Sequence, residues 1–168
     1  MCIMCTGASH TQVIDHHVRL IDEHGWTITG VTGPLPWTYT IGLTWHLEHP
    51  ELIVIGMEPT SAAGVLHRVV DRIRAGTALT VGTSLAMLGG DLGFGAVDPR
   101  NLLGEWFAQW HPIARASDHA GASLRALQVR LPGPDDRSFC AEQRALERRC
   151  TVDALSRRRA RTQEPPVW

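Results

Sequence analysis

Two neighbouring apolar runs between Trp37 and Met57 constrain the fold of this chain more than any other feature. In the first run, large apolar residues alternate with small or polar ones, so that one side holds Trp37, Tyr39, Ile41 and Leu43 and the other holds Thr38, Thr40, Gly42 and Thr44. Such period-two alternation is typical of a strand with one buried face. The second run, from Glu51 to Met57, is apolar at almost every position and predicts a strand covered on both faces. Together the runs predict two adjacent strands in the middle of a sheet.

The other elements follow from periodicity and from glycine or proline breaks. We expect two main helices, over about residues 11–24 and 61–75, each followed by a glycine that suits a left-handed C-terminal position. Their expected N-caps are Ser9 or Thr11 for the first and Thr60 or Ser61 for the second. We also predict strands over 26–31, 79–81, 94–97 and 123–131, a loop over 89–95 and a short helix over 102–110. The strand over 26–31 should pair antiparallel with the run that begins at Trp37.

These elements describe an α+β fold with a mostly antiparallel sheet and two main flanking helices. A sheet that curls toward a barrel is the alternative that the same strands allow. A chain of 168 residues has the size of one domain, and we place a single globular domain at residues 1–134. Residues 135–168 are rich in Arg, and we expect them to form an extension that is partly helical or disordered.

The composition excludes several classes of protein. Hydrophobic residues make up 43% of the chain and charged residues 20%, as in an ordinary globular domain. No run of about eighteen apolar residues occurs, so we expect no membrane association. The N-terminus lacks a secretory signal pattern, and four Cys in such a chain indicate a cytoplasmic protein with reduced thiols. All 16 basic residues are Arg, which excludes chemistry that needs Lys, such as Schiff-base formation.

The charge pattern gives little support to a nucleic-acid partner. The net charge is −1, so no overall field attracts nucleic acid. The Arg-rich tail could contact an acidic partner by charge, but it lacks interleaved aromatic residues and any known nucleic-acid module. We therefore expect no nucleic-acid partner apart from a contact of this tail.

The N-terminal residues form a candidate metal site. Cys2 and Cys5 are spaced so that both sulfurs can reach one ion, and three imidazoles follow at His10, His16 and His17. Thiolates and imidazoles are the ligands that Zn²⁺ prefers, and four of them complete a tetrahedral structural site. No second CxxC is present, so the alternative is that both cysteines act as small hydrophobes at a packed terminus.

A second group of candidate residues lies around the connection between the two central strands. Aromatic, imidazole and carboxylate side chains gather there, at Tyr39, Trp45, His46, His49 and Glu51. Rings and imidazoles at strand ends can line a small-molecule pocket, and a His–Glu pair can perform acid–base work. The alternative is structural: Tyr39 in the core, Trp45 and His46 covering the loop, His49 bonded to a backbone carbonyl, and Glu51 on the surface.

Several motifs in a fixed order resemble one known family. After the N-terminal Cys-Ile-Met-Cys come His24-Gly25-Trp26, Tyr39-Thr40-Ile41-Gly42-Leu43 and His49-Pro50-Glu51-Leu52. This combination resembles the bacterial family called domain of unknown function 4262, over roughly Met1 to Leu131. The resemblance implies no established activity, substrate or cofactor. Residues 132–136 match the family's pattern only in part, and the Arg-rich tail departs from it.

The leading functional hypothesis is a binding module for a small ligand or a protein partner, with its site near the Tyr39–Glu51 connection. From another class, the alternative is a metal-dependent enzyme that uses Cys2, Cys5 and a nearby histidine, with zinc as the expected metal. The third hypothesis is a flavin-binding split barrel, which rests only on the alternating strands. Whether the chain is an enzyme is left open, as are the substrate and the oligomeric state.

Overall fold

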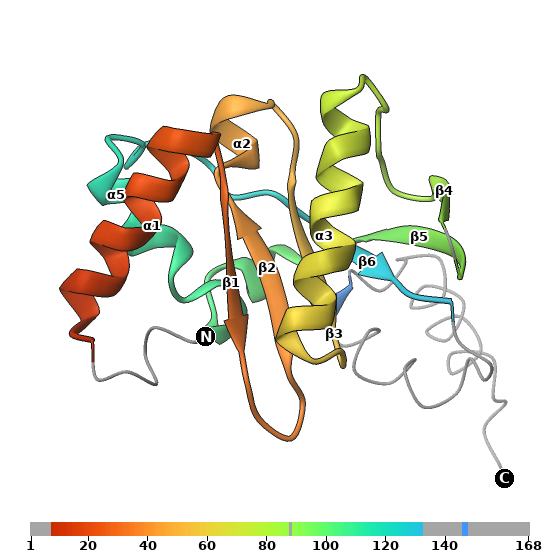
Figure 1. The fold of residues 1–168 in the computed structure, drawn as a ribbon, viewed down its shortest axis with the longest axis horizontal. Helices are drawn as coiled ribbons and strands as arrows, with labels where there is room; N and C mark the ends of the chain where they lie inside the picture. Colours follow the sequence, from red (N-terminus) through yellow and green to blue (C-terminus); the bar gives the residue numbers. More distant parts are fainter. Residues whose placement is uncertain (1–7, 88, 133–145, 148–168) are drawn as a thin grey trace, which may run out of the picture.

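The computed structural model of the chain describes residues 8–87, 89–132 and 146–147. Cys2 and Cys5 lie outside the described residues, as does the predicted extension apart from Leu146 and Glu147. In the described part, a mixed sheet is flanked by helices on both faces (Figure 1). No described helix has both the length and the apolar character that crossing a membrane requires.

The sheet has six strands in the order β1-β2-β3-β6-β5-β4. Their bounds are β1 (Thr27–Val31), β2 (Trp37–Ile41), β3 (Glu51–Ile55), β4 (Ser84–Met87), β5 (Gly90–Ala96) and β6 (Ala126–Arg130). Only the β3–β6 pair among them is parallel, which confirms an α+β fold with a mostly antiparallel sheet. The sheet is open, with β1 and β4 at its edges, so the barrel-like alternative is wrong. The hypothesis of a flavin-binding split barrel loses the barrel that it assumed, and flavin binding itself stays a prediction.

The two central strands lie where the alternation predicts them. β2 pairs antiparallel with both β1 and β3, and every residue of β3 is buried. Leu52 and Val54 pack on the face covered by α3, whereas Ile53 and Ile55 pack on the opposite face. The predicted alternation ends early, because Gly42 adopts a φ of 111° and turns the chain into a short helix, α2 (Leu43–His46). Leu43 therefore packs on the α3 side and not beside Tyr39.

The two long helices cover opposite faces of the sheet (Figure 1). α1 (His10–His24) begins with a capping box between Ser9 and Gln12 and ends at Gly25, whose φ is 80°. α3 (Pro59–Arg74) begins two residues before the expected position. Its cap is the Glu58 side chain, which accepts hydrogen bonds from the next N–H groups, and Pro59 occupies the first turn where no N–H is needed.

The glycine-rich middle of the chain differs from expectation. The predicted strand at 79–81 is absent from the structure, and β4 forms at 84–87 instead. Most of the predicted 89–95 loop is part of β5, which pairs with β6. Gly90 lies close to Pro132 and Gly95 lies close to Glu147, so a residue with a Cβ would not fit at either position without a shift of its neighbour. The predicted helix at 102–110 is divided into α4 (Pro99–Leu102), the 3-10 turn η2 (Glu105–Phe107) and α5 (Trp110–Ala116). Gly104, which is extended, separates the first two.

Candidate functional site

Glu51 is the centre of the region that the sequence singles out. Its side chain is fully buried at the start of β3, and its carboxylate accepts five hydrogen bonds. The donors are the hydroxyl of Thr40 at 2.7 Å, the backbone N–H groups of Gly42, Leu43 and Thr44 at 3.0–3.3 Å, and the indole of Trp110 at 3.3 Å. The expectation of a surface position for Glu51 is therefore wrong. The carboxylate caps α2 and joins it to β2, β3 and α5.

The environment of Glu51 contains opposing electrostatic influences. Burial raises the pKa of the carboxyl above its usual value, because the charged form loses its hydration. Hydrogen bonds from Thr40, Thr44, Gly42 and Trp110 lower it again. With all these donors satisfied inside the protein, the geometry favours a structural role for this carboxylate.

Tyr39 belongs to the same buried region. Its ring is buried against Phe107, with the ring centroids 5.0 Å apart. Its hydroxyl accepts a hydrogen bond of 3.1 Å from the Gln109 backbone N–H, immediately before α5. Burial raises the pKa of the phenol above its usual value. Tyr39 therefore fastens the start of α5 to β2 and has no exposed surface for a ligand.

Trp45 and His46 form the outer part of the predicted cluster. The Trp45 ring stacks on His119, with centroids 4.7 Å apart and planes at 15°, and it also lies 5.5 Å from Trp110. His46 is exposed and meets His119 edge to face at 5.9 Å. His119 comes from the segment after α5, and its partnership with α2 could not be read from local spacing. These rings cover α2 and leave His46 available to solvent.

His49 has a separate environment. It is buried, and its Nδ1 lies 2.7 Å from the Pro50 carbonyl, as expected for a histidine that bonds a backbone carbonyl. Burial lowers the pKa of its imidazole, and this carbonyl opposes the change. No described hydrogen bond joins His49 to Glu51, so the structure does not assemble the acid–base pair. The ligand-binding role of the five predicted residues stays a prediction.

The histidines of the proposed metal site are spread along α1. His17 is buried, with its Nδ1 3.0 Å from the Thr27 hydroxyl, and burial lowers the pKa of its imidazole to about 4. The Nδ1 of His16 faces the Arg19 guanidinium at 2.9 Å. His10 lies two helical turns before His17, which is about 10 Å along the axis. Within the described part of the chain, no three His, Cys, Asp or Glu side chains form a metal site. Because Cys2 and Cys5 lie outside it, the zinc site stays a prediction.

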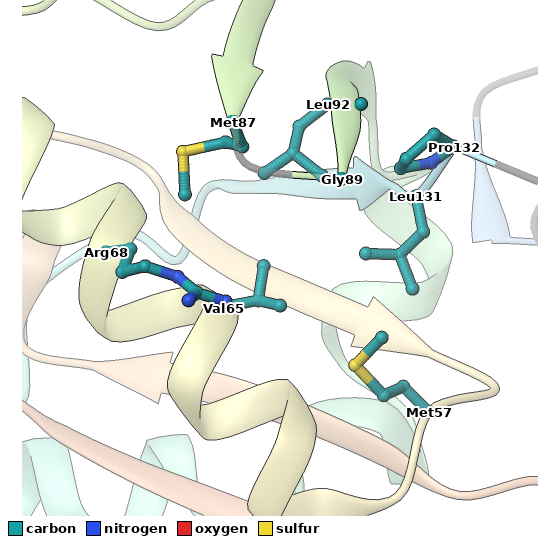
Figure 2. Close-up of a pocket in the computed structure, with 9 residues that line it drawn as sticks. Met57, Val65, Arg68, Met87, Gly89, Leu92, Leu131 and Pro132 are labelled. Atoms are coloured by element: carbon teal, nitrogen blue, oxygen red, sulfur yellow. The ribbon is translucent and has the colours of Figure 1, made fainter.

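A groove that the sequence analysis did not predict runs between α3 and the β4–β5 hairpin (Figure 2). Its inner hollow has a volume of about 180 Å³, and its walls include Met57, Val65, Arg68, Met87, Leu92 and Leu131. A second hollow of about 460 Å³, the outer hollow, adjoins the inner one. It shares Arg68 and Met87 with the inner hollow and is also lined by Asp71, Arg72 and Ala86. Figure 2 shows the apolar side chains converging from α3, the hairpin and the segment after β6.

The groove escaped the sequence analysis because its walls come from distant segments. The arginines of α3 have the spacing of an ordinary solvated helix face, which local sequence does not distinguish from a groove wall. One sequence feature could have indicated the groove: Met57 and Met87 lie beside glycine-rich turns, and methionine is common at adaptable binding surfaces.

One comparison with known proteins gives a match. The family model for a domain of unknown function (DUF4262) matches residues 20–140. No curated protein and no solved structure matches the chain. The matched range includes all six strands, α3 and the aromatic cluster around α2. Since the match covers more than half of the chain, the protein belongs to the family defined by the domain of unknown function 4262.

Proposed function

We propose that this protein is a binding module for a small amphipathic anion, which it holds in the groove between α3 and the β4–β5 hairpin. The observation that carries the proposal is the chemistry of the groove walls. Apolar side chains surround the inner hollow, and Arg68 lines both the inner and the outer hollow. A ligand with an apolar body and an anionic group matches this combination.

The inner hollow suits the apolar part of such a ligand. Val65 and Leu92 come from regular elements and fix two of its walls, while Met57 and Met87 supply flexible, polarisable side chains. Taken with the outer hollow, the space approaches the size at which proteins bind small molecules. Such sites are mostly apolar and have a few polar groups that orient the ligand.

The outer hollow suits the anionic part. Its lining includes two arginines, Arg68 and Arg72, and one acid, Asp71, so the cations outnumber the acid by one. Both guanidinium groups are exposed, and neither takes part in an ion pair or hydrogen bond that the described residues form. They therefore remain available to a carboxylate or a similar group.

The test uses decanoate as the probe and decanol as its uncharged control, each competing with the fluorescent anion 8-anilinonaphthalene-1-sulfonate. We expect decanoate to displace the dye more strongly than decanol. Arg68→Ala should weaken decanoate binding by up to about fivefold, since an exposed ion pair contributes at most about 1 kcal/mol. Met87→Asp should weaken it at least about tenfold, because it adds a repelling charge and removes apolar contact.

The matched control is Arg115→Ala, which removes an exposed arginine from α5 on the other face of the sheet. It should leave decanoate binding unchanged. Melting curves of all variants check that the fold is retained. Equal decanoate affinity in the Arg68→Ala and Arg115→Ala proteins, together with an unaffected Met87→Asp protein, would show that the groove is not the binding site.

A further inference from the structure

The outer hollow of the groove contains one acidic side chain beside its two arginines. Asp71 lies three positions after Arg68 and one before Arg72 on α3, and all three side chains line this hollow. Side chains three or four positions apart on a helix are neighbours on one face, with about 5–6 Å between their Cβ atoms. An anionic group that binds the two guanidinium groups therefore also comes close to the Asp71 carboxylate.

The Asp71 carboxylate is available to a ligand. Its side chain is exposed, and it forms no hydrogen bond or ion pair with any residue that the structure describes, although Arg68 is about one helical turn away. Arg74, which lies three positions later, donates a hydrogen bond to the His24 carbonyl instead. The outer hollow thus offers a ligand two free cations and one free acceptor.

This free carboxylate has opposite effects on two kinds of anion. A simple fatty acid presents only a second carboxylate, and two unit charges about 5 Å apart in water of low ionic strength repel each other enough to weaken binding about fourfold. An acid with a hydroxyl group next to its carboxylate can instead donate a hydrogen bond to Asp71, and hydrogen bonds to charged groups are among the stronger ones in proteins. The same side chain therefore disfavours the first ligand and favours the second.

We infer that Asp71 is a specificity-determining residue of the groove, and that the ligand it selects is an amphipathic 2-hydroxy acid. This role of Asp71 rests on the proposed function, since it requires that the groove bind a carboxylate. The ligand carboxylate contacts Arg68 and Arg72, and its hydroxyl donates to Asp71. The apolar body extends past Met87, which lines both hollows, into the inner hollow (Figure 2).

The test compares decanoate with racemic 2-hydroxydecanoate, which has the same charge and chain length, in competition with 8-anilinonaphthalene-1-sulfonate. The measured quantity is the ratio of the two dissociation constants, from which the affinity for the dye cancels. We expect the wild type to bind 2-hydroxydecanoate at least about fivefold more tightly than decanoate. 2-Methoxydecanoate keeps the oxygen but lacks the donor, so it should bind no more tightly than decanoate.

Replacement of the acid should change the two affinities in different ways. Asp71→Ala should remove the preference for 2-hydroxydecanoate and should bind decanoate about two- to fourfold more tightly than the wild type, because the repelling charge is gone. A purely structural role for Asp71 would not tighten decanoate binding. The matched control is Asp22→Ala, which removes an exposed aspartate near the end of α1, on the other face of the sheet. It should keep the wild-type preference, and melting curves check that both variants are folded.

Different results would refute the proposed function and the role of Asp71. If neither acid displaces the dye, the groove does not bind amphipathic anions, and both fail. If decanoate binds but the wild type and Asp71→Ala give the same ratio of dissociation constants, only the role of Asp71 is overturned. A preference that disappears in Asp71→Ala and persists in Asp22→Ala supports it.

Discussion

Replacement of Glu51 tests whether one buried carboxylate organises the centre of the molecule. Gln has the same shape as Glu but has one acceptor oxygen and one NH₂ group. If the oxygen takes the place of Oε1, it keeps the hydrogen bonds from Gly42, Thr44 and Trp110. The NH₂ group then faces the Leu43 N–H and the Thr40 hydroxyl, both of which are donors in the wild type.

The magnitude follows from the donors that lose their acceptor. The Thr40 oxygen accepts a hydrogen bond of 2.9 Å from the Leu52 N–H and has a second lone pair that can accept from the new NH₂ group, but its own O–H then has no acceptor in place of Oε2. Two buried donors are therefore left unsatisfied, at about 1–3 kcal/mol each. Removal of a buried charge returns part of this cost, so we expect Glu51→Gln to lower the free energy of unfolding by about 2–4 kcal/mol. Glu51→Ala removes the acceptor of all five donors, and we expect it to lower the free energy of unfolding by more than about 4 kcal/mol.

Urea unfolding at pH 7, followed by circular dichroism, measures these differences. For a chain of this size, the Glu51→Gln change corresponds to a fall in melting temperature of about 5–15 °C. Glu48→Gln is the matched control, since Glu48 is exposed three positions earlier, and its effect should stay below about 0.5 kcal/mol. If Glu51→Gln proves as stable as Glu48→Gln, the carboxylate does not hold α2 and α5 in place and the reasoning fails.

Three further predictions follow from the buried and N-terminal residues. His17 has a pKa of about 4 in the folded protein against 6.5 in the unfolded chain, so the unfolded state binds more protons between these values and stability falls as the pH is lowered through them. From pH 7 to pH 4.5, the wild type should lose about 2 kcal/mol more than His17→Asn in urea unfolding, and equal losses would contradict this. Tyr39→Phe removes the acceptor of the Gln109 N–H and should cost about 1–2 kcal/mol; an unchanged unfolding midpoint would contradict the role of this bond. If Cys2 and Cys5 bind zinc, elemental analysis of chelator-free protein should find metal that a Cys2→Ser/Cys5→Ser variant lacks, and a folded, metal-free wild type would end that hypothesis.

The local sequence predicts an element of secondary structure well where the residues of one short segment determine that element. The alternation from Trp37 predicts β2, and the continuous apolar run after Glu51 predicts a strand buried on both faces, because side-chain period alone reports burial. Gly25 marks the end of α1 for a similar reason, since it can adopt the left-handed conformation without a steric cost. The order of the family's motifs could likewise be read directly.

The surroundings of the candidate site residues are formed by contacts between distant segments, so the local sequence does not predict them. Glu51 looked like a surface residue at the start of a strand, because nothing near it in sequence shows that Trp110, 59 positions later, approaches it. The glycines from Gly89 to Gly95 looked like a loop, because their pairing with β6 and the packing of Glu147 on Gly95 are long-range events.

The sequence by itself determined the central strands, the ends of α1 and the family, since each depends on residues within a few positions of one another. Only the tertiary structure decided that Glu51 is buried, that the sheet stays open, and that Arg68 borders an apolar groove. The physical reason is that hydrogen-bond satisfaction and cavity shape are properties of groups meeting in space. A residue's neighbours along the chain report its backbone preference, but they do not reveal which donors, walls or charges the fold will bring to it.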